Sequence, residues 1–258
     1  MELQLLKTDL LPLYKEQVGM FQEKFEALKD AEISTETFSF YTSVSAIASS
    51  KIEGELLEID SYIKHRMLAI EYHQNLVQKP NDLYQAYLLA QQSNLNERNF
   101  IKAHQLITQH LLPKNKQGKL RNVNMVVMEH KTFRVQYEAA PFEAVAALMK
   151  VLWKDIDTLK KTQLTVEEVF YFAASIHMVF VNIHPFEDGN GRAGRLLEKW
   201  FIAQKLGMKA WFLQSELNYY RNINHYYANL NRLGVFFEQL DYAQALPFLL
   251  MLPNALND

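Results

Sequence analysis

Cysteine is absent from the 258 residues of this chain. Disulfide bonds, a thiolate nucleophile and zinc held by thiolates are therefore excluded. The absence of disulfides fits a reducing compartment such as the cytoplasm. Glycine and proline are also scarce, at 8 and 7 residues. Because these two residues make many of the tight turns between strands, their scarcity favours an all-α fold over a sheet-rich one.

The chain also has little excess charge and no long uninterrupted apolar segment. Its 27 Lys and Arg are balanced by 29 Asp and Glu, which leaves a formal net charge of −2 and no electrostatic pull toward nucleic acid or an anionic membrane. The longest apolar run, at about 170–183, is interrupted by Ser175, His177 and Asn182 and is expected to be too short to span a bilayer. The first four residues show no signal peptide. We therefore expect a cytoplasmic protein with no nucleic-acid partner and no membrane association.

Apolar residues recur at helical spacing along most of the chain. One helix is expected at about 35–54, where Gly54 ends it, and Pro80 is expected to separate two others. Further helices are expected at 62–77, 82–95, 100–112, 142–159, 166–181, 191–206, 216–233 and 236–252. The β-prone run Met125–Met128, followed by the alternating segment Phe133–Tyr137, predicts a two-stranded hairpin.

The densest group of chemically active side chains lies between His184 and Arg195, where the sequence reads HPFEDGNGRAGR. Pro185 cannot continue the helix before it, and Gly189 and Gly191 allow a tight turn into a new helix. The first backbone N–H groups of a helix have no helical partner, and the helix dipole favours an anion beside them. Phosphate is the usual guest at such a place.

Four side chains of this stretch suit a phosphorylated substrate. Arg192 and Arg195 are three residues apart on one side of the new helix, and their forked donors match phosphate oxygens. Asp188 supplies a hard oxygen, and one carboxylate with substrate phosphates is the usual way to hold Mg²⁺. His184 has an ordinary pKa near neutrality and can act as a general base. Taken singly, each is more often a core histidine or a salt-bridged residue; together they predict a phosphorylated substrate held through Mg²⁺.

The string from His184 to Arg195 resembles the signature of Fic-domain proteins, HPFx(D/E)GNGRxxR, at every position. The predicted hairpin resembles the flap of that family, and Gly118–Arg121 and Tyr226–Leu230 resemble further family segments, so the resemblance covers about 83–233. It implies a Fic-type helical bundle with a small β-hairpin flap. It also implies an enzyme, a protein adenylyltransferase, which transfers AMP from ATP to a Ser, Thr or Tyr hydroxyl and releases pyrophosphate.

The resemblance gives the motif residues their roles. His184 would deprotonate the target hydroxyl, Phe186 would anchor the loop in the core, and Asp188 would bind Mg²⁺. The phosphates of ATP would be held by an anion hole and two guanidinium groups, made by Gly189, Asn190, Gly191, Arg192 and Arg195. Tyr227 is a candidate for the adenine pocket, with a core tyrosine as the alternative.

A second motif lies upstream, at Ser49–Gly54. Glu53 falls at the C-terminal end of a predicted helix, where the dipole disfavours a carboxylate by about 0.3–1 kcal/mol. Alone it would be a solvated glutamate. The stretch resembles the inhibitory motif of the family, a Ser or Thr, three residues, Glu, and then Gly or Asn, matched by Ser49, Glu53 and Gly54. Its position resembles the self-inhibited class with an N-terminal inhibitory helix, which implies that Glu53 pairs with Arg195 and withholds it from the γ-phosphate.

These resemblances divide the chain into three parts: an N-terminal helical region at 1–79 with the inhibitory helix at about 35–54, a Fic catalytic core at 80–233, and a C-terminal helix at 234–258 packed on the core. In the hairpin, Val135, Gln136 and Tyr137 are candidates for docking the target by strand addition, with a purely structural hairpin as the alternative. The expected partners are ATP and a protein with an exposed hydroxyl, the chain itself included. Whether the chain forms a homo-oligomer is left open.

Several alternatives remain at this stage. The chain could be a Fic enzyme that uses another nucleotide donor or acts mainly as a de-AMPylase, or a nucleotide-binding regulator without activity. A metal hydrolase built on His177 and His184 lacks further ligands in the sequence. The basic stretch Lys114–Arg121 is interpreted as a solvated loop with no role in nucleic-acid binding.

Overall fold

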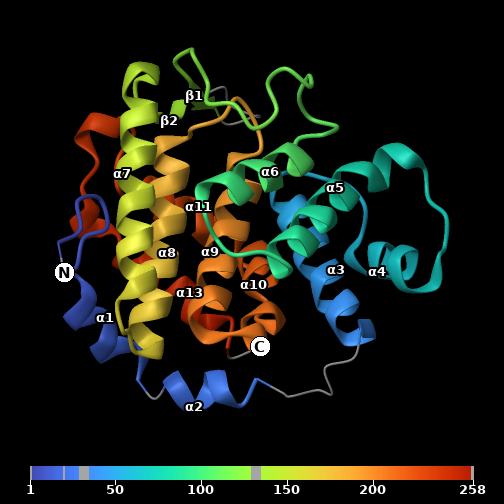
Figure 1. The fold of residues 1–258 in the computed structure, drawn as a ribbon, viewed down its shortest axis with the longest axis horizontal. Helices are drawn as coiled ribbons and strands as arrows, with labels where there is room; N and C mark the ends of the chain where they lie inside the picture. Colours follow the sequence, from blue (N-terminus) through green and yellow to red (C-terminus); the bar gives the residue numbers. More distant parts are fainter. Residues whose placement is uncertain (1, 20, 29–34, 129–134, 257–258) are drawn as a thin grey trace.

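The computed structural model describes residues 2–19, 21–28, 35–128 and 135–256 (Figure 1). The helices are α1 (Leu11–Val18), α2 (Phe21–Glu26), α3 (Thr35–Ile52), α4 (Ile59–Leu68), α5 (Gln74–Gln91), α6 (Glu97–Ile107), α7 (Phe142–Lys161), α8 (Val166–Ile183), α9 (Asn190–Leu206), α10 (Ser215–Arg221), α11 (Ile223–Asn231), α12 (Leu246–Leu249) and α13 (Met251–Asn254). The remaining elements are the strands β1 (Val126–Met128) and β2 (Val135–Glu138) and the short 3-10 helices η1 (Met208–Phe212), η2 (Phe237–Gln239) and η3 (Tyr242–Gln244). The predicted all-α fold with a small hairpin is confirmed.

Helix α8 lies at the centre of the fold. A capping box fixes its start: the Thr165 side chain accepts from the Glu168 backbone N–H, and the Glu168 side chain accepts from that of Thr165. From Val169 to Phe180 every residue is buried. By length and composition alone α8 could cross a membrane, contrary to the expectation for the shorter run, but 78% of it is buried inside this fold. Its apolar surface is therefore used to build the core.

Two groups of helices meet around α8 and α9 (Figure 1). Helices α1, α2, α7 and α12 pack on α8, while α3 packs on α4, α5, α9 and α10. Helix α9 contacts both α8 and α5, so it joins the two groups. The loop between α8 and α9, which begins the stretch from His184 to Arg195, therefore lies where the two groups of helices meet.

The hairpin was predicted correctly in type and place. Strands β1 and β2 are antiparallel, with Val126 opposite Glu138, Val127 opposite Tyr137 and Met128 opposite Val135. The register shifts between Val127 and Met128. The connecting residues 129–134, which include two positions of the predicted second strand, lie outside the described residues. The other edge of β2 is joined at one point, where the Glu138 N–H donates to the Val235 carbonyl at 2.7 Å.

Several predicted helix boundaries were wrong: the helices expected at 62–77 and 216–233 are each divided in two, and two further cases involve proline. Pro80 lies inside α5, at a cost of one backbone hydrogen bond, because burial of Pro80 and its neighbours Leu83 and Tyr84 holds the helix together around it. The boundary predicted between residues 79 and 80 therefore falls within a helix. The single helix predicted at 236–252 is absent: the segment forms η2, η3 and two short helices, because Pro247 and Pro253 lack the N–H groups that a longer helix needs. The segment does pack on the core.

Candidate active site

The loop from His184 to Gly189 is closed by its own side chains. His184 caps α8 in the left-handed conformation (φ 53°, ψ 60°), which costs an L-residue about 1–2 kcal/mol. Asn190 holds the loop shut, because its Oδ1 accepts from the Phe186 N–H at 3.0 Å and its Nδ2 donates to the Phe186 carbonyl at 2.8 Å. The Asn190 side chain is thus used for closure, and its part in an anion hole can come only from its backbone N–H.

His104 also supports the loop, a role that the sequence did not predict. The ring of Phe186 is fully buried and stacks on that of His104, with centroids 3.6 Å apart. The Gly118 N–H lies 3.1 Å from His104 Nδ1, so the ring proton is on Nε2 and is donated to the Asp188 carbonyl at 3.0 Å. Burial lowers the pKa of His104 to about 4. His104 is therefore a neutral, fixed support near pH 7.

Arg121 holds the other side of the loop. Its Nε donates to the His184 carbonyl at 2.7 Å and its Nη1 to the Val123 carbonyl at 2.7 Å, while Nη2 donates to the Ala140 carbonyl beyond the hairpin. Its backbone N–H donates to the Pro185 carbonyl at 2.9 Å. Arg121 is 3% exposed, so the interpretation of this stretch as a solvated loop was wrong for this residue. One guanidinium group therefore fixes the catalytic loop relative to the hairpin.

Helix α9 starts at the predicted anion site. Gly189 adopts φ 80°, and a Cβ there would meet Thr108 Cγ2 at 2.8 Å, so both backbone and packing require glycine. The next N–H groups begin α9 and have no helical partner. At Gly191 a Cβ would lie 2.3 Å from Glu53 Oε1. The Glu53 carboxylate therefore lies directly against the backbone of the turn that is expected to bind phosphate.

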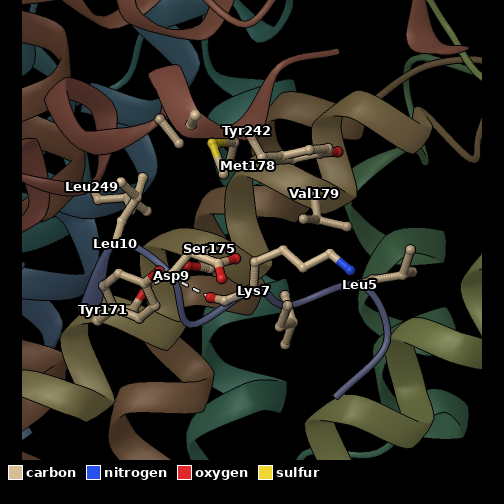
Figure 2. Close-up of a pocket in the computed structure, with 13 residues that line it drawn as sticks. Leu5, Lys7, Asp9, Leu10, Tyr171, Ser175, Met178, Val179, Tyr242 and Leu249 are labelled. Atoms are coloured by element: carbon tan, nitrogen blue, oxygen red, sulfur yellow. Dashed lines mark hydrogen bonds between the residues drawn. The ribbon is translucent and has the colours of Figure 1, made fainter. Parts of the chain in front are cut away.

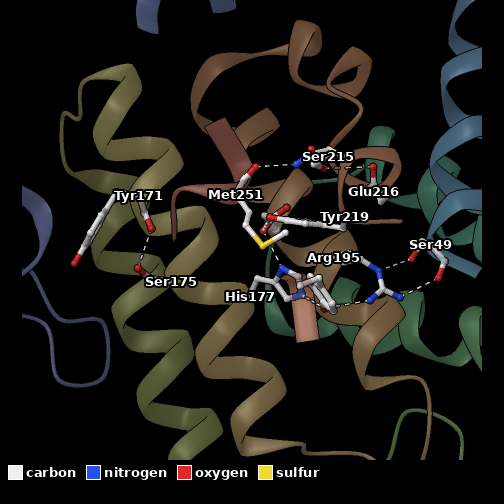
Figure 3. Close-up of polar contacts among 12 residues, drawn as sticks. Ser49, Tyr171, Ser175, His177, Arg195, Ser215, Glu216, Tyr219 and Met251 are labelled. Atoms are coloured by element: carbon white, nitrogen blue, oxygen red, sulfur yellow. Dashed lines mark hydrogen bonds and ion pairs between the residues drawn. The ribbon is translucent and has the colours of Figure 1, made fainter. Parts of the chain in front are cut away.

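The predicted pairing of Glu53 with Arg195 is present. Arg195 Nη2 donates to Glu53 Oε1 at 2.7 Å. The same Nη2 donates to the Ser49 carbonyl at 3.0 Å, and Arg195 Nε donates to Ser49 Oγ at 2.8 Å (Figure 3). Arg195 is 1% exposed, and the Glu53 side chain 28%. Burial raises the pKa of Glu53, but the charges of Arg195 and Arg192 lower it more, so that the pKa lies below its usual value. The pair is therefore charged near pH 7.

Helix α3, the predicted inhibitory helix, is anchored along α9 as well as at its end. One turn before Ser49, Ser45 Oγ accepts from Lys199 Nζ at 2.7 Å. Gly54, at φ 90°, ends α3 as predicted. The Tyr227 hydroxyl donates to the Ile52 carbonyl at 3.1 Å, which ties the last residue of α3 to α11. Glu53 thus projects from the end of a helix that is itself held in place.

Glu55, missed in the sequence, binds the second arginine. Arg192 Nη2 lies 3.2 Å from Glu55 Oε1, which also accepts from Lys79 Nζ at 2.9 Å. The side chains of Arg192 and Glu55 are 4% and 13% exposed. The residues Glu53 and Glu55 therefore occupy both arginines of the motif. An acidic residue in a loop carries no periodic signal, so only the contact could reveal it.

His184 is arranged as a base. Its Nδ1 lies 3.3 Å from the Val181 carbonyl, so Nδ1 carries the proton and Nε2 is left as the acceptor. Burial lowers the pKa of His184, and this effect outweighs the opposing hydrogen bond to Val181. The imidazole is therefore neutral near pH 7, as a proton acceptor must be.

A pocket opens beside this histidine. Its lining comes from the motif, the inhibitory segment, the hairpin and α11: Glu53, Val127, Gln136, Tyr137, Val181, Asn182, His184, Gly191, Arg195, Tyr226, Tyr227, Leu230 and Asn231. Tyr227 is 36% exposed, so it lines the pocket as the adenine hypothesis requires. Tyr137 also lines it, but its hydroxyl donates to the Asn182 carbonyl at 2.5 Å, and only its backbone can serve a target.

Asp188 remains the candidate ligand for Mg²⁺. It is exposed at the start of the turn, and its Oδ1 accepts from the Gly189 N–H at 2.5 Å. In the part of the chain that the structure describes, no group of three or more acidic or His residues could hold an ion alone. A single accessible carboxylate fits Mg²⁺ that is bound together with substrate phosphates.

A second cavity lies under the N-terminal segment (Figure 2). It is bordered by Leu10, Tyr171, Met178 and Leu249, and the Tyr171 hydroxyl donates to the Lys7 carbonyl there at 2.9 Å. Its lining includes none of the motif residues between 184 and 195. The chemistry expected of the chain therefore belongs to the pocket beside His184.

Part of the chain matches a known protein family. Residues 94–202 match the model of the Fic/DOC family. The fold is similar to that of a Fic family protein from Desulfovibrio desulfuricans G20, with a TM-score of 0.79 and 20% identity over 100% of this chain and 76% of that one. It is similar to a Fic domain containing signaling protein from Bacteroides thetaiotaomicron VPI-5482, with a TM-score of 0.69 and 20% identity over 93% and 95% of the two chains.

Fic-1 of C. elegans (residues 134–508) is a further structural relative, with a TM-score of 0.68 and 15% identity over 96% of this chain and 70% of that one. At such identities these likenesses concern the fold alone. No curated protein matches the chain significantly.

Proposed function

From the premise that residues 94–202 form a Fic/DOC domain, we propose that the chain is a protein adenylyltransferase whose activity is held down by Glu53. It transfers AMP from ATP to a hydroxyl of a protein. The observation that carries the inhibition is the double contact of Glu53, which binds Arg195 at 2.7 Å and lies against Gly191.

The transfer follows from the positions of the groups. His184 Nε2 takes the proton of the target hydroxyl, whose oxygen forms a bond to the α-phosphorus as the bond to pyrophosphate breaks. The N–H groups at the start of α9 stabilise charge on the α- and β-phosphates, and Arg192 and Arg195 stabilise it on the leaving part. Mg²⁺ at Asp188, when bound, neutralises further phosphate charge. The fixed loop holds the reacting atoms in line, and this positioning supplies much of the rate.

Inhibition comes from competition between Glu53 and the triphosphate of ATP for the same two groups. A triphosphate in the productive pose needs Arg195 for its γ-phosphate and the face of the turn at Gly191 for its other oxygens. The Glu53 carboxylate occupies both. ATP must therefore displace Glu53 or bind in a pose in which His184 cannot act.

The target docks along β2. Val135 is 48% exposed, and the edge of β2 away from β1 is joined to the C-terminal segment only at Glu138 among the described residues. An extended target segment can pair with the backbone at Val135 and Gln136. Because Gln136 and Tyr137 line the pocket, a segment bound there brings its hydroxyl toward His184.

The test is mass spectrometry of the Glu53→Gly protein after incubation with ATP and Mg²⁺. Addition of AMP to the protein itself, or to proteins of a lysate, supports the proposal. GTP, CTP and UTP are tested in parallel, and preferred transfer from one of them would replace ATP as the donor. Loss of AMP from a modified protein without any transfer would make the chain a de-AMPylase.

Two variants control this experiment. Glu58→Gly makes the same replacement at a glutamate whose side chain is 74% exposed and bound to Lys51, and it should stay as inactive as the parent. Glu53→Gly with His184→Ala should bind ATP without transferring AMP. Transfer in this double variant would show that His184 is not the base.

A further inference from the structure

A chain of buried hydrogen bonds runs from Arg195 away from the nucleotide pocket. Arg195 Nη1 lies 3.3 Å from the Tyr226 hydroxyl, and that hydroxyl lies 3.1 Å from His177 Nε2. His177 Nδ1 lies 2.8 Å from Glu198 Oε2, which also accepts from the Tyr219 hydroxyl at 2.8 Å. The rings of His177 and Tyr219 are in edge-on contact, with centroids 5.7 Å apart (Figure 3). This series of hydrogen bonds therefore connects α9 with α8, α10 and α11.

The hydrogen bonds of this series are all donated in the same direction, from Arg195 toward Glu198. Arg195 can only donate, so the Tyr226 oxygen accepts from it and the Tyr226 O–H is free to donate to His177 Nε2. His177 Nδ1 then donates to the Glu198 carboxylate. Each hydrogen has an acceptor in this arrangement, and it ends on a carboxylate with no further partner on Oε1 among the described atoms. Tyr226 is thereby oriented to accept from Arg195.

Burial makes this orientation rigid. Arg195, His177, Tyr226 and Glu198 are 1%, 0%, 2% and 0% exposed. Arg195 and Glu198 are three residues apart on α9 and share one face. Arg195 and Tyr226 also border the pocket beside His184, but so little of them is exposed that protein groups supply the partners of the Tyr226 hydroxyl. Its position is set by the protein alone.

Among the described residues, the other hydrogen-bond partners of Arg195 are Ser49 and Glu53, of the predicted inhibitory motif. Ser49 gives two contacts from α3, and Glu53 follows the end of the same helix. Binding of ATP in the proposed productive pose removes Glu53 from these partners. Tyr226 comes from α11, outside that segment, and does not have to leave when Glu53 does.

We propose that Tyr226, oriented by His177 and Glu198, is a positioning residue that keeps Arg195 directed at the γ-phosphate once Glu53 has left. The proposal rests on the proposed function, in which Arg195 binds that phosphate. It predicts an effect specific to the γ-phosphate, because the rest of the nucleotide is held by other groups.

The experiment compares binding of ATP and ADP by calorimetry, with Mg²⁺, in a Glu53→Gly, His184→Ala protein that cannot transfer AMP, with and without Tyr226→Phe. The phenylalanine keeps the ring and removes only the hydroxyl. We expect ATP to bind about tenfold more weakly, equivalent to about 1.4 kcal/mol, while ADP binding changes less than twofold. Equal changes for the two nucleotides, or no change, would overturn the proposal.

Tyr219→Phe is the matched control. It removes a buried hydroxyl that donates to the Glu198 carboxylate but has no contact with Arg195. It should leave the ratio of ATP to ADP affinity unchanged, even where the melting temperature falls. His177→Gln tests the same idea with Tyr226 in place and should lower the ratio by about threefold; an unchanged ratio would remove His177 from the proposal. Binding is measured without transfer, so a Glu53→Gly protein that binds ATP but adds no AMP would overturn the proposed function instead.

Discussion

The Glu53 contact can be separated into a charge and a volume by two substitutions. Glu53→Gly removes both the carboxylate that binds Arg195 and the atoms that lie against Gly191. Glu53→Gln keeps nearly the same volume and loses the negative charge. If inhibition comes from both, activity should rise in the order parent, Gln variant, Gly variant.

The contacts of Glu53 give the expected gain in activity for each substitution. A hydrogen bond to a charged group contributes about 1.5–3 kcal/mol and a neutral one about 0.5–1.5 kcal/mol. The Arg195 side chain is 1% exposed, but the Glu53 side chain is 28% exposed. The free energy of this hydrogen bond should therefore lie at the lower end of the range for charged groups, at about 1.5–2 kcal/mol. With a factor of ten for each 1.4 kcal/mol, the Gly variant should gain about 10- to 30-fold in kcat/KM for ATP. The Gln variant should gain about three- to fivefold.

The assay is the initial rate of AMP incorporation, measured over a range of ATP concentrations for the parent, Glu53→Gln and Glu53→Gly. Glu58→Gln is the control for removal of an acidic charge from the same segment. Melting temperatures show whether each variant is folded. Equal rates for all three proteins would refute the competition between Glu53 and the triphosphate, and a Gln variant as active as the Gly variant would refute the part assigned to volume.

Three further predictions concern the same site. Because the pKa of His184 is lowered below 6.5 by burial, the neutral base is lost only at lower pH, so the acidic limb of kcat/KM for Glu53→Gly should lie below pH 6.5; a limb above pH 7 would contradict this. Adding Glu55→Gln to Glu53→Gly replaces the charged partner of the buried Arg192 with a neutral one and should lower KM for ATP about threefold, since a charged hydrogen bond contributes about 1 kcal/mol more than a neutral one; an unchanged KM in the kinetic assay would dismiss Glu55. Arg121→Ala leaves several buried carbonyls unpaired, at about 3 kcal/mol, and calorimetry should show a melting temperature about 6–12 °C lower; a change under 2 °C would refute its role in fixing the loop.

The catalytic loop was predictable because its determinants are local. Proline, the glycines and the arginines of residues 184–195 follow one another, and each limits the backbone or the chemistry of its neighbours. The hairpin was predictable for the same reason, since alternation within a few residues indicates a strand. The pairing of Glu53 with Arg195 spans 142 residues, and only the resemblance to a family suggested it.

What the sequence could not provide depends on tertiary contacts. Arg121 lies among exposed cations, and nothing in its neighbourhood says that it is buried and binds the carbonyl of His184. His104 falls on an ordinary amphipathic helix, and its role depends on Phe186, which is 82 positions away in the sequence. Pro80 was expected to end a helix, because local propensity does not include the packing that keeps α5 continuous.

The most direct measurement of the central claim uses the Glu53→Gly protein and ATP labelled at either the α- or the γ-phosphate. Covalent label should appear on protein from α-labelled ATP alone, with labelled pyrophosphate released from the γ-labelled nucleotide, and both signals should vanish with His184→Ala. Label on protein from the γ-position would mean that the chain transfers phosphate rather than AMP. No label from either position, in a folded protein that binds ATP, would contradict the account.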